Sequence, residues 1–127
     1  MEPKDVYDPT MVAMDDALHA YHRESGLAAI PFSAQAGGWF QKHSQPDATA
    51  RGKSPYDSPV NLARLERARK LAVESGLTMT QTVLGYLTGQ SFATVPIVGC
   101  KNQAQLADSL TTGDVRLSPD QIRFLEK

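Results

Sequence analysis

Apolar residues recur at helical spacing in five stretches of the chain, each bounded by capping or turn residues. In the first stretch, Asp8 and Pro9 suit an N-cap and a first helical residue, and Gly26 suits the end of the helix. The apolar positions of this helix are Met11, Met14, Leu18 and Tyr21. A second helix is expected after residue 60, ending at Gly76. Its predicted apolar face consists of Leu62, Leu65, Ala68 and Ala72.

Three further helix starts are predicted in the second half of the chain, two of them from capping boxes. In a capping box, a side-chain oxygen at the N-cap and a Glu or Gln three residues later bond to each other's backbone. The three pairs with this spacing are Thr78 and Gln81, Asn102 and Gln105, and Ser118 and Gln121. Apolar residues at helical spacing follow each pair, so each marks the start of an amphipathic helix.

Two short apolar runs, residues 27–32 and 94–98, lack helical spacing. Neither alternates polar with apolar residues, which favours strands buried on both faces of a parallel sheet. Pro31 has no N–H to donate, so it is expected at a strand end or an unpaired position. The order of helix, strand, long loop, two helices, strand and two helices predicts an α/β fold with two parallel strands and five helices. Two strands leave two bare edges, so the pattern looks like part of a larger structure.

Composition and charge limit the classes of function. The chain has 127 residues, 41% of them hydrophobic and 21% charged, which is typical of one soluble globular domain. Its formal net charge of −1 gives no excess of positive charge, so neither nucleic acid nor a membrane is expected as a partner. No apolar run is long enough to span a bilayer and no signal peptide is recognisable, so a cytoplasmic protein is expected. Cys100, the only cysteine, excludes an intrachain disulfide and a cysteine metal cluster.

The turn after the second apolar run suits an anion. Gly99 allows a tight turn, and the free N–H groups that open the next helix would point toward a phosphate or carboxylate. Lys101 adds a full positive charge. The side chains one and two helical turns further on are Gln105, Asp108 and Ser109, which could bond a ribose, a phosphate or a base. The alternative is a common strand-to-helix turn with a solvated lysine, and this turn by itself favours that alternative.

The loop after the first apolar run is a second candidate site. Residues 33–60 are rich in Gly, Ser and Pro, and loops of this length inside a domain are usually functional or disordered. Ser33 and the backbone amides up to Gly38 could contact a pyrophosphate, since ligands bind at the carboxyl ends of parallel strands. The alternative is a flexible glycine loop, and this loop by itself favours that alternative. Two such loops after neighbouring strands would face the same mouth, which favours a ligand site.

Other patterns have less support. Residues 72–78 resemble the turn of a helix-turn-helix, but the following helix has no Lys or Arg for DNA phosphates. His19 and His22 are three residues apart on a helix with only Glu24 nearby, which favours surface histidines over a metal site. His43, in the long loop, is a candidate catalytic residue without an identifiable partner.

Together these segments resemble the C-terminal part of an aldo-keto reductase, nearly from end to end. Residues 20–40 are similar to that family's helix leading into its seventh barrel strand, and residues 61–90 to its seventh helical layer. Residues 95–110 resemble the eighth strand with the nucleotide-binding turn after it, and residues 115–126 the closing segment. The resemblance implies a (β/α)₈ TIM barrel that reduces aldehydes or ketones with NADPH, of which residues 1–127 would be a partial domain.

The resemblance also implies roles for individual residues in an NADP(H) site. The implied set is Ser33, Gln35 and Gly38 at the pyrophosphate, Gly99, Lys101 and Gln105 at the adenosine 2′-phosphate, and Asp108 and Ser109 at the adenine. The family usually has leucine where Gln35 stands, and it often has asparagine where Ser109 stands.

The family's catalytic Asp, Tyr, Lys and His belong to its first five strands, whereas this chain resembles the part after the sixth. No catalytic residue is therefore expected, and hydride transfer would lack its acid catalyst. The expected function is a reductase-like fragment that holds part of the NADP(H) site and is not catalytic alone. A second copy, a separate N-terminal half or repacked helices would cover the bare strand edges. The alternative is a self-associating remnant or interaction module that is not an enzyme and binds no cofactor.

Overall fold

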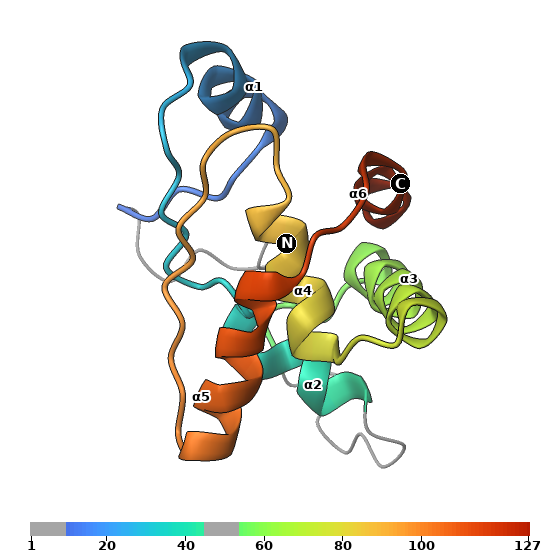
Figure 1. The fold of residues 1–127 in the computed structure, drawn as a ribbon. Helices are drawn as coiled ribbons and strands as arrows, with labels where there is room; N and C mark the ends of the chain where they lie inside the picture. Colours follow the sequence, from blue (N-terminus) through green and yellow to red (C-terminus); the bar gives the residue numbers. More distant parts are fainter. Residues whose placement is uncertain (1–9, 45–53) are drawn as a thin grey trace.

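The computed structural model describes residues 10–44 and 54–127. In Figure 1, the extended segments after α1 and after α4 run side by side, and α3, α4, α5 and α6 lie on one side of them. Helix α4 is central, because it packs against α2, α3 and α5. The helical elements are α1 (Asp16–Ser25), η1 (Ala36–Gly38), α2 (Trp39–Ser44), α3 (Pro59–Ser75), α4 (Met79–Thr88), α5 (Gln103–Leu110), η2 (Thr111–Asp114) and α6 (Pro119–Glu126).

The three helix starts predicted from capping pairs are confirmed. Reciprocal capping boxes open α4 at Thr78 and α6 at Ser118. At α5, Asn102 Oδ1 accepts the N–H of Gln105 at 2.9 Å, whereas the Gln105 side chain bonds to the N–H of Lys101 instead of Asn102. Each of these contacts satisfies N–H groups that the first helical turn leaves unpaired.

The first helix begins later than predicted. Helix α1 starts at Asp16, and the N-cap is Asp15, whose Oδ1 accepts the N–H of Leu18 at 2.8 Å. Met11 and Met14 precede the helix, so the prediction that they belong to its apolar face is wrong. The proposed cap at Asp8 and Pro9 lies outside the described residues. Asp15 is the stronger signal because Asp16, directly after it, places a second carboxylate in the first turn, where the helix dipole favours it. The end at Gly26 is confirmed, with φ 69°.

The prediction of one long loop over residues 33–60 is also wrong in part. Helices η1 and α2 lie within it, and Trp39 and Phe40 of α2 are buried in one cluster with Leu65 and Ala68 of α3. Helix α3 begins at Pro59, because Ser58 Oγ caps it. A helix of six residues is not stable by itself, so the packing of Trp39 and Phe40 accounts for α2.

The two predicted strands are not confirmed as strands in the described ranges. They are joined by one isolated parallel bridge, between Ala29 and Thr94. Three backbone hydrogen bonds link them: Ala29 N–H to Ala93 O (2.9 Å), Val95 N–H to Ala29 O (2.9 Å) and Ile97 N–H to Pro31 O (3.0 Å). The next bond of a parallel ladder would run from the N–H of residue 31 to the carbonyl of Val95. Pro31 has no N–H, which explains why the pairing stops there.

Burial on both faces, predicted for these segments, is wrong for the part of the chain that the structure describes. Ala29 is buried, but its neighbour Ile30 is exposed, and so are Val95 and Ile97 of the second segment. Helices cover the segments on one side (Figure 1). The opposite side chains therefore have no second layer to pack against.

Candidate nucleotide-binding site

The loop after the first extended segment and the helix after the second meet through one side-chain contact. Gln35 Nε2 donates to Ser109 Oγ of α5 at 3.3 Å, although 74 residues separate them. Cys100 Sγ lies 3.8 Å from the same hydroxyl. The structure therefore places residues of the two predicted half-sites together. This is the consequence of two segments that run parallel and end at the same edge.

The start of α5 leaves a positive charge toward solvent. Lys101 is exposed, and its ammonium has no ion pair or hydrogen bond within residues 10–44 and 54–127. A Cβ at Gly99 would meet no atom within 4 Å, so there is open space beside this turn. Gln105 Oε1 accepts the backbone N–H of Lys101 at 2.8 Å, which folds this side chain onto its own turn. Within the described residues, the turn before α5 thus presents an ammonium group without a partner, and the Gln105 side chain stabilises that turn.

The side chain of Asp108 links α5 to α4. Its Oδ1 accepts the hydroxyl proton of Thr78, the N-cap of α4, at 2.9 Å. A second link runs from Gln81 Nε2 to Thr111 Oγ1 at 2.9 Å. Through this carboxylate oxygen, Asp108 holds α5 against α4 and so positions the turn that carries Lys101. This contact uses one acceptor site of the carboxylate, and further acceptor sites on its two oxygens suit the predicted contact with adenine.

The glycine loop has an unusual backbone. Ala36, Gly37 and Gly38 have φ angles of 49°, 62° and 77°, which form a left-handed turn before α2. The N–H of Ala36 bonds to Ser33 O, and that of Gly38 bonds to Gln35 O, both at 2.9 Å. The amide of Gly38 is therefore already used in the turn, and an anion would have to replace that bond. The Ser33 side chain is exposed.

Gln41 and Lys42 of α2, which were not predicted as site residues, also lie beside the glycine loop. Gln41 Nε2 donates to Gln35 Oε1 and to Thr80 Oγ1, both at 3.0 Å, which orients the Gln35 amide. Lys42 Nζ donates to the carbonyl of Gly37 at 3.0 Å, so a second exposed ammonium lies on the glycine loop. The sequence could have indicated the helix that carries Gln41 and Lys42, because the spacing of Trp39, Phe40 and His43 fits one helical turn after the glycines.

His43 has a partner that sequence reasoning missed. Its Nε2 lies 3.0 Å from Asp57 Oδ1, although the alignment is not that of a hydrogen bond. The same Oδ1 accepts Trp39 Nε1–H at 2.8 Å, and Asp57 Oδ2 accepts the N–H of Ser54 at 3.0 Å. His43 Nδ1 donates to the carbonyl of Trp39 at 2.9 Å, and the two rings stack 4.5 Å apart. The group is almost fully buried, so it has a structural role: it anchors α2 to the turn before α3.

Tyr86, on α4, has a hydroxyl with a raised pKa. Burial raises the pKa of the Tyr86 hydroxyl above its ordinary value of 10.0, and the Glu126 carboxylate raises it further. Near neutral pH the hydroxyl therefore stays protonated and donates to Glu126 Oε1 at 3.3 Å. This contact ties α4 to the end of α6, and no contact in the described ranges joins Tyr86 to Gln35, Lys101 or Ser109.

A separate cleft of about 490 Å³ lies between α1, the end of α4 and α6. None of the predicted site residues lines it. Its charges are mixed, because Arg23, Arg123 and Glu126 all line it. Each arginine already has a neighbouring carboxylate, Glu24 and Asp120 respectively. The cleft therefore does not offer the excess charge that would select an ion.

The left-handed turn gives a first prediction. Ala36→Val is expected to lower the free energy of unfolding by about 2 kcal/mol, because a β-branched side chain fits a positive φ poorly and adds volume at a buried position. Urea denaturation followed by far-UV circular dichroism measures this. Ala93→Val, in an exposed extended segment, is the matched control and should change stability by less than about 0.5 kcal/mol. Equal effects at the two sites would contradict the strain argument.

Comparison with known proteins gives one family. Residues 7–127 match the model of the Aldo/keto reductase family. The chain is 26% identical over 116 residues to the versiconal hemiacetal acetate reductase of Aspergillus parasiticus, in an alignment covering 84% of this chain and 34% of that protein. It is 24% identical over 113 residues to a putative aryl-alcohol dehydrogenase of Saccharomyces cerevisiae, covering 82% of this chain and 30% of that protein. The chain thus spans about a third of the length of these relatives. No helix in the described ranges is long and apolar enough to cross a membrane.

Proposed function

The chain belongs to the aldo/keto reductase family, as its resemblance predicted, and we propose that it holds the phosphate end of NADP(H) in a carbonyl oxidoreductase. The family implies a TIM-barrel fold, of which this chain would supply the last segments. The observation that carries the proposal is the contact of Gln35 with Ser109, because it joins the glycine loop to the helix that begins beside Lys101.

The residues fit a nucleotide with three phosphate groups. Two exposed ammonium groups, on Lys42 and Lys101, suit phosphate oxygens, and the space beside Gly99 leaves room for an approaching group. We assign Lys101, Gly99 and Gln105 to the adenosine 2′-phosphate. We assign Ser33, Gln35 and Gly38 to the pyrophosphate, with Lys42 as an added cation, and Asp108 and Ser109 to the adenine. Each role is a binding role.

NADPH would supply a hydride to the carbonyl carbon of an aldehyde or ketone. The chain's own part is to hold the nucleotide in one orientation, which lowers the entropy cost of bringing the hydride donor to its acceptor. One relative is named a reductase and the other a putative aryl-alcohol dehydrogenase, and both names describe redox enzymes, which supports this reaction class. We infer that a proton donor comes from outside residues 1–127, so the chain alone binds the cofactor without turnover.

The test is a titration of the purified chain with NADPH and, separately, with NADH. Lys101→Ala is expected to weaken NADPH about tenfold, because a charge-assisted hydrogen bond to the 2′-phosphate contributes about 1.5 kcal/mol or more. NADH lacks that phosphate, so its affinity should hardly change. Trp39, the only tryptophan, directly follows Gly38, so its fluorescence reports binding at the loop.

Lys70→Ala is the matched control, since Lys70 is an exposed lysine of α3 whose ammonium lies 3.8 Å from Glu74. It should leave both affinities unchanged. An absence of saturable NADPH binding would refute the proposed function. An equal loss for NADPH and NADH in Lys101→Ala would refute the assignment of Lys101 to the 2′-phosphate.

A further inference from the structure

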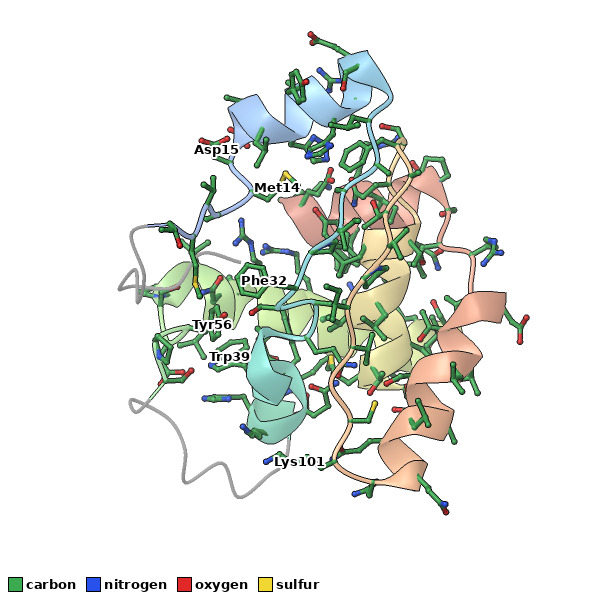
Figure 2. All side chains as sticks on the ribbon, turned by 90° about the vertical axis from the view of Figure 1, so that its left-hand side faces the viewer. Met14, Asp15, Phe32, Trp39, Tyr56 and Lys101 are labelled. Carbon is green, nitrogen blue, oxygen red and sulfur yellow. The ribbon has the colours of Figure 1, made fainter. Side chains whose placement is uncertain are left out.

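A chain of side-chain hydrogen bonds joins the glycine loop to α2, α4 and α5. Gln41, on α2, donates from Nε2 to Thr80 Oγ1 of α4 and to Gln35 Oε1 of the loop, both at 3.0 Å. Gln35 Nε2 donates in turn to Ser109 Oγ of α5 at 3.3 Å. Figure 2 shows α2 at the same end of the molecule as Lys101, which lies in the turn before α5. Gln41 therefore connects the first turn of α4 to the loop residue that meets α5.

The orientation of the Gln41 amide is fixed by its surroundings. Its nitrogen has two N–H groups, and the bonds to Thr80 and Gln35 use both of them. Its Oε1 is buried and has no hydrogen-bond partner among the described residues. If the amide turned over, both N–H groups would occupy that position, so two donors instead of one acceptor would be buried without a partner. The observed orientation is therefore the more stable one, because an unpaired carbonyl is better tolerated than unpaired donors.

The orientation of Gln41 in turn sets that of Gln35. An amide oxygen accepts and an amide nitrogen donates, so Oε1 of Gln35 faces the donor on Gln41. The Gln35 nitrogen is then turned toward Ser109, and the bond to Ser109 Oγ uses only one of its two N–H groups. The other N–H group has no hydrogen-bond partner within residues 10–44 and 54–127. Half-buried Gln35 thus keeps a donor available in the glycine loop.

We propose that Gln41 is a positioning residue for the pyrophosphate of NADP(H): it keeps the amide nitrogen of Gln35, and not the amide oxygen, available to the nucleotide. This inference rests on the proposed function, in which Gln35 contacts the pyrophosphate. The pyrophosphate oxygens carry negative charge and accept hydrogen bonds, so an N–H group attracts them and a carbonyl oxygen repels them. Gln41 acts through Gln35 and needs no contact with the nucleotide.

Gln41→Glu reverses this network without removing a bond from it. A carboxylate only accepts, so it draws the amide nitrogen of Gln35 toward position 41. The hydroxyl groups of Thr80 and Ser109 can donate as well as accept. Thr80 then donates to the carboxylate, and Ser109 donates to Gln35 Oε1. The contacts between the elements are kept, but the carbonyl oxygen of Gln35 replaces its nitrogen on the side of Ser109.

The test compares the dissociation constant for NADP⁺, which tolerates acid, between the purified chain and its Gln41→Glu variant, followed by Trp39 fluorescence. Gln41→Glu is expected to weaken binding about tenfold at pH 7, because a hydrogen bond to a charged group is lost. The ratio of the two constants should return toward one as the pH falls to about 4.5, near the ordinary pKa of a glutamic acid. The protonated carboxyl group can then donate to Gln35 again. A purely structural role of Gln41 gives no such recovery.

Gln35→Leu separates this effect from the negative charge that glutamate adds. Leucine, which the family usually has at this position, has no amide to turn. In the Gln35→Leu background, Gln41→Glu should weaken NADP⁺ less than about twofold at about 0.15 M salt, which screens exposed charges beyond about 8 Å. A tenfold loss in both backgrounds would mean that the carboxylate simply repels the phosphates, and it would overturn the proposal.

Far-UV circular dichroism shows whether each variant is folded. If Gln41→Glu is not, Gln41→Met takes its place, because it removes both donors without adding charge, and it should weaken NADP⁺ about threefold only when Gln35 is present. An unchanged affinity in Gln41→Glu, or a loss that does not recover in acid, overturns the inference alone. If the unmodified chain shows no saturable binding, the proposed function fails and this inference fails with it, so the two failures are distinguishable.

Discussion

Replacing Asp57 with alanine is expected to lower the free energy of unfolding by about 2–4 kcal/mol. Asp57 accepts hydrogen bonds from Trp39 Nε1 and from the N–H of Ser54, and its Oδ1 lies 3.0 Å from His43 Nε2. Alanine removes the acceptor and leaves the buried Trp39 Nε1–H and the partly buried N–H of Ser54 without it. An unsatisfied buried donor costs about 1–3 kcal/mol, so the combined loss is a large part of the stability of a small domain.

Urea denaturation followed by circular dichroism measures the loss, and Trp39 fluorescence reports the local change. Asp114→Ala provides the control, because Asp114 is exposed in η2, and it should cost less than about 0.5 kcal/mol. A loss below about 1 kcal/mol in Asp57→Ala would show that Trp39, Ser54 and His43 find other partners, and that the cluster does not anchor α2.

Helix starts that are determined by residues close in the sequence were predictable. The helix starts at Thr78, Asn102 and Ser118 follow from side chains that bond to the backbone within four residues. Helix α2 was not predictable in this way, because it has six residues and depends on contacts with Leu65 and Ala68 of α3. Local signals thus predict helices that begin with a cap, whereas packing decides those that do not.

The candidate site also contains some contacts that the sequence could predict and others that it could not. The meeting of Gln35 with Ser109 follows from two parallel segments that end at one edge, so sequence reasoning could expect it. The pairing of His43 with Asp57 could not be expected, because the two residues are neither at helical spacing nor on one predicted element. Lys42 was missed for a related reason: its position on the glycine loop depends on the helix that was predicted as loop.

Burial on both faces of the extended segments was predicted from the absence of polar residues. An apolar pattern indicates that both faces of a segment are suited to burial. It does not say which part of the structure covers each face. In the described ranges, helices supply one face only, and the chain spans about a third of its relatives' length. The exposure of Ile30 and Ile97 therefore follows from the lack of a second layer among the described residues.

Leu65→Ala is expected to lower the free energy of unfolding by about 2–5 kcal/mol. Leu65 is 1% exposed in the cluster formed by Trp39, Phe40 and Ala68, so alanine removes apolar contacts and leaves a cavity that the rigid rings of Trp39 and Phe40 fill poorly. The same substitution at Leu62, on the same helix, is the matched control. Both leucines were predicted on the buried face of this helix, but Leu62 is 40% exposed, and its loss should cost about 1 kcal/mol or less.

Urea denaturation of the two variants and of the unmodified chain measures the loss in the free energy of unfolding at each position. Helix propensity changes equally at both positions, so the difference between them isolates the burial of Leu65. Equal losses would mean that Leu62 is covered in solution by a surface outside the described residues or by another chain.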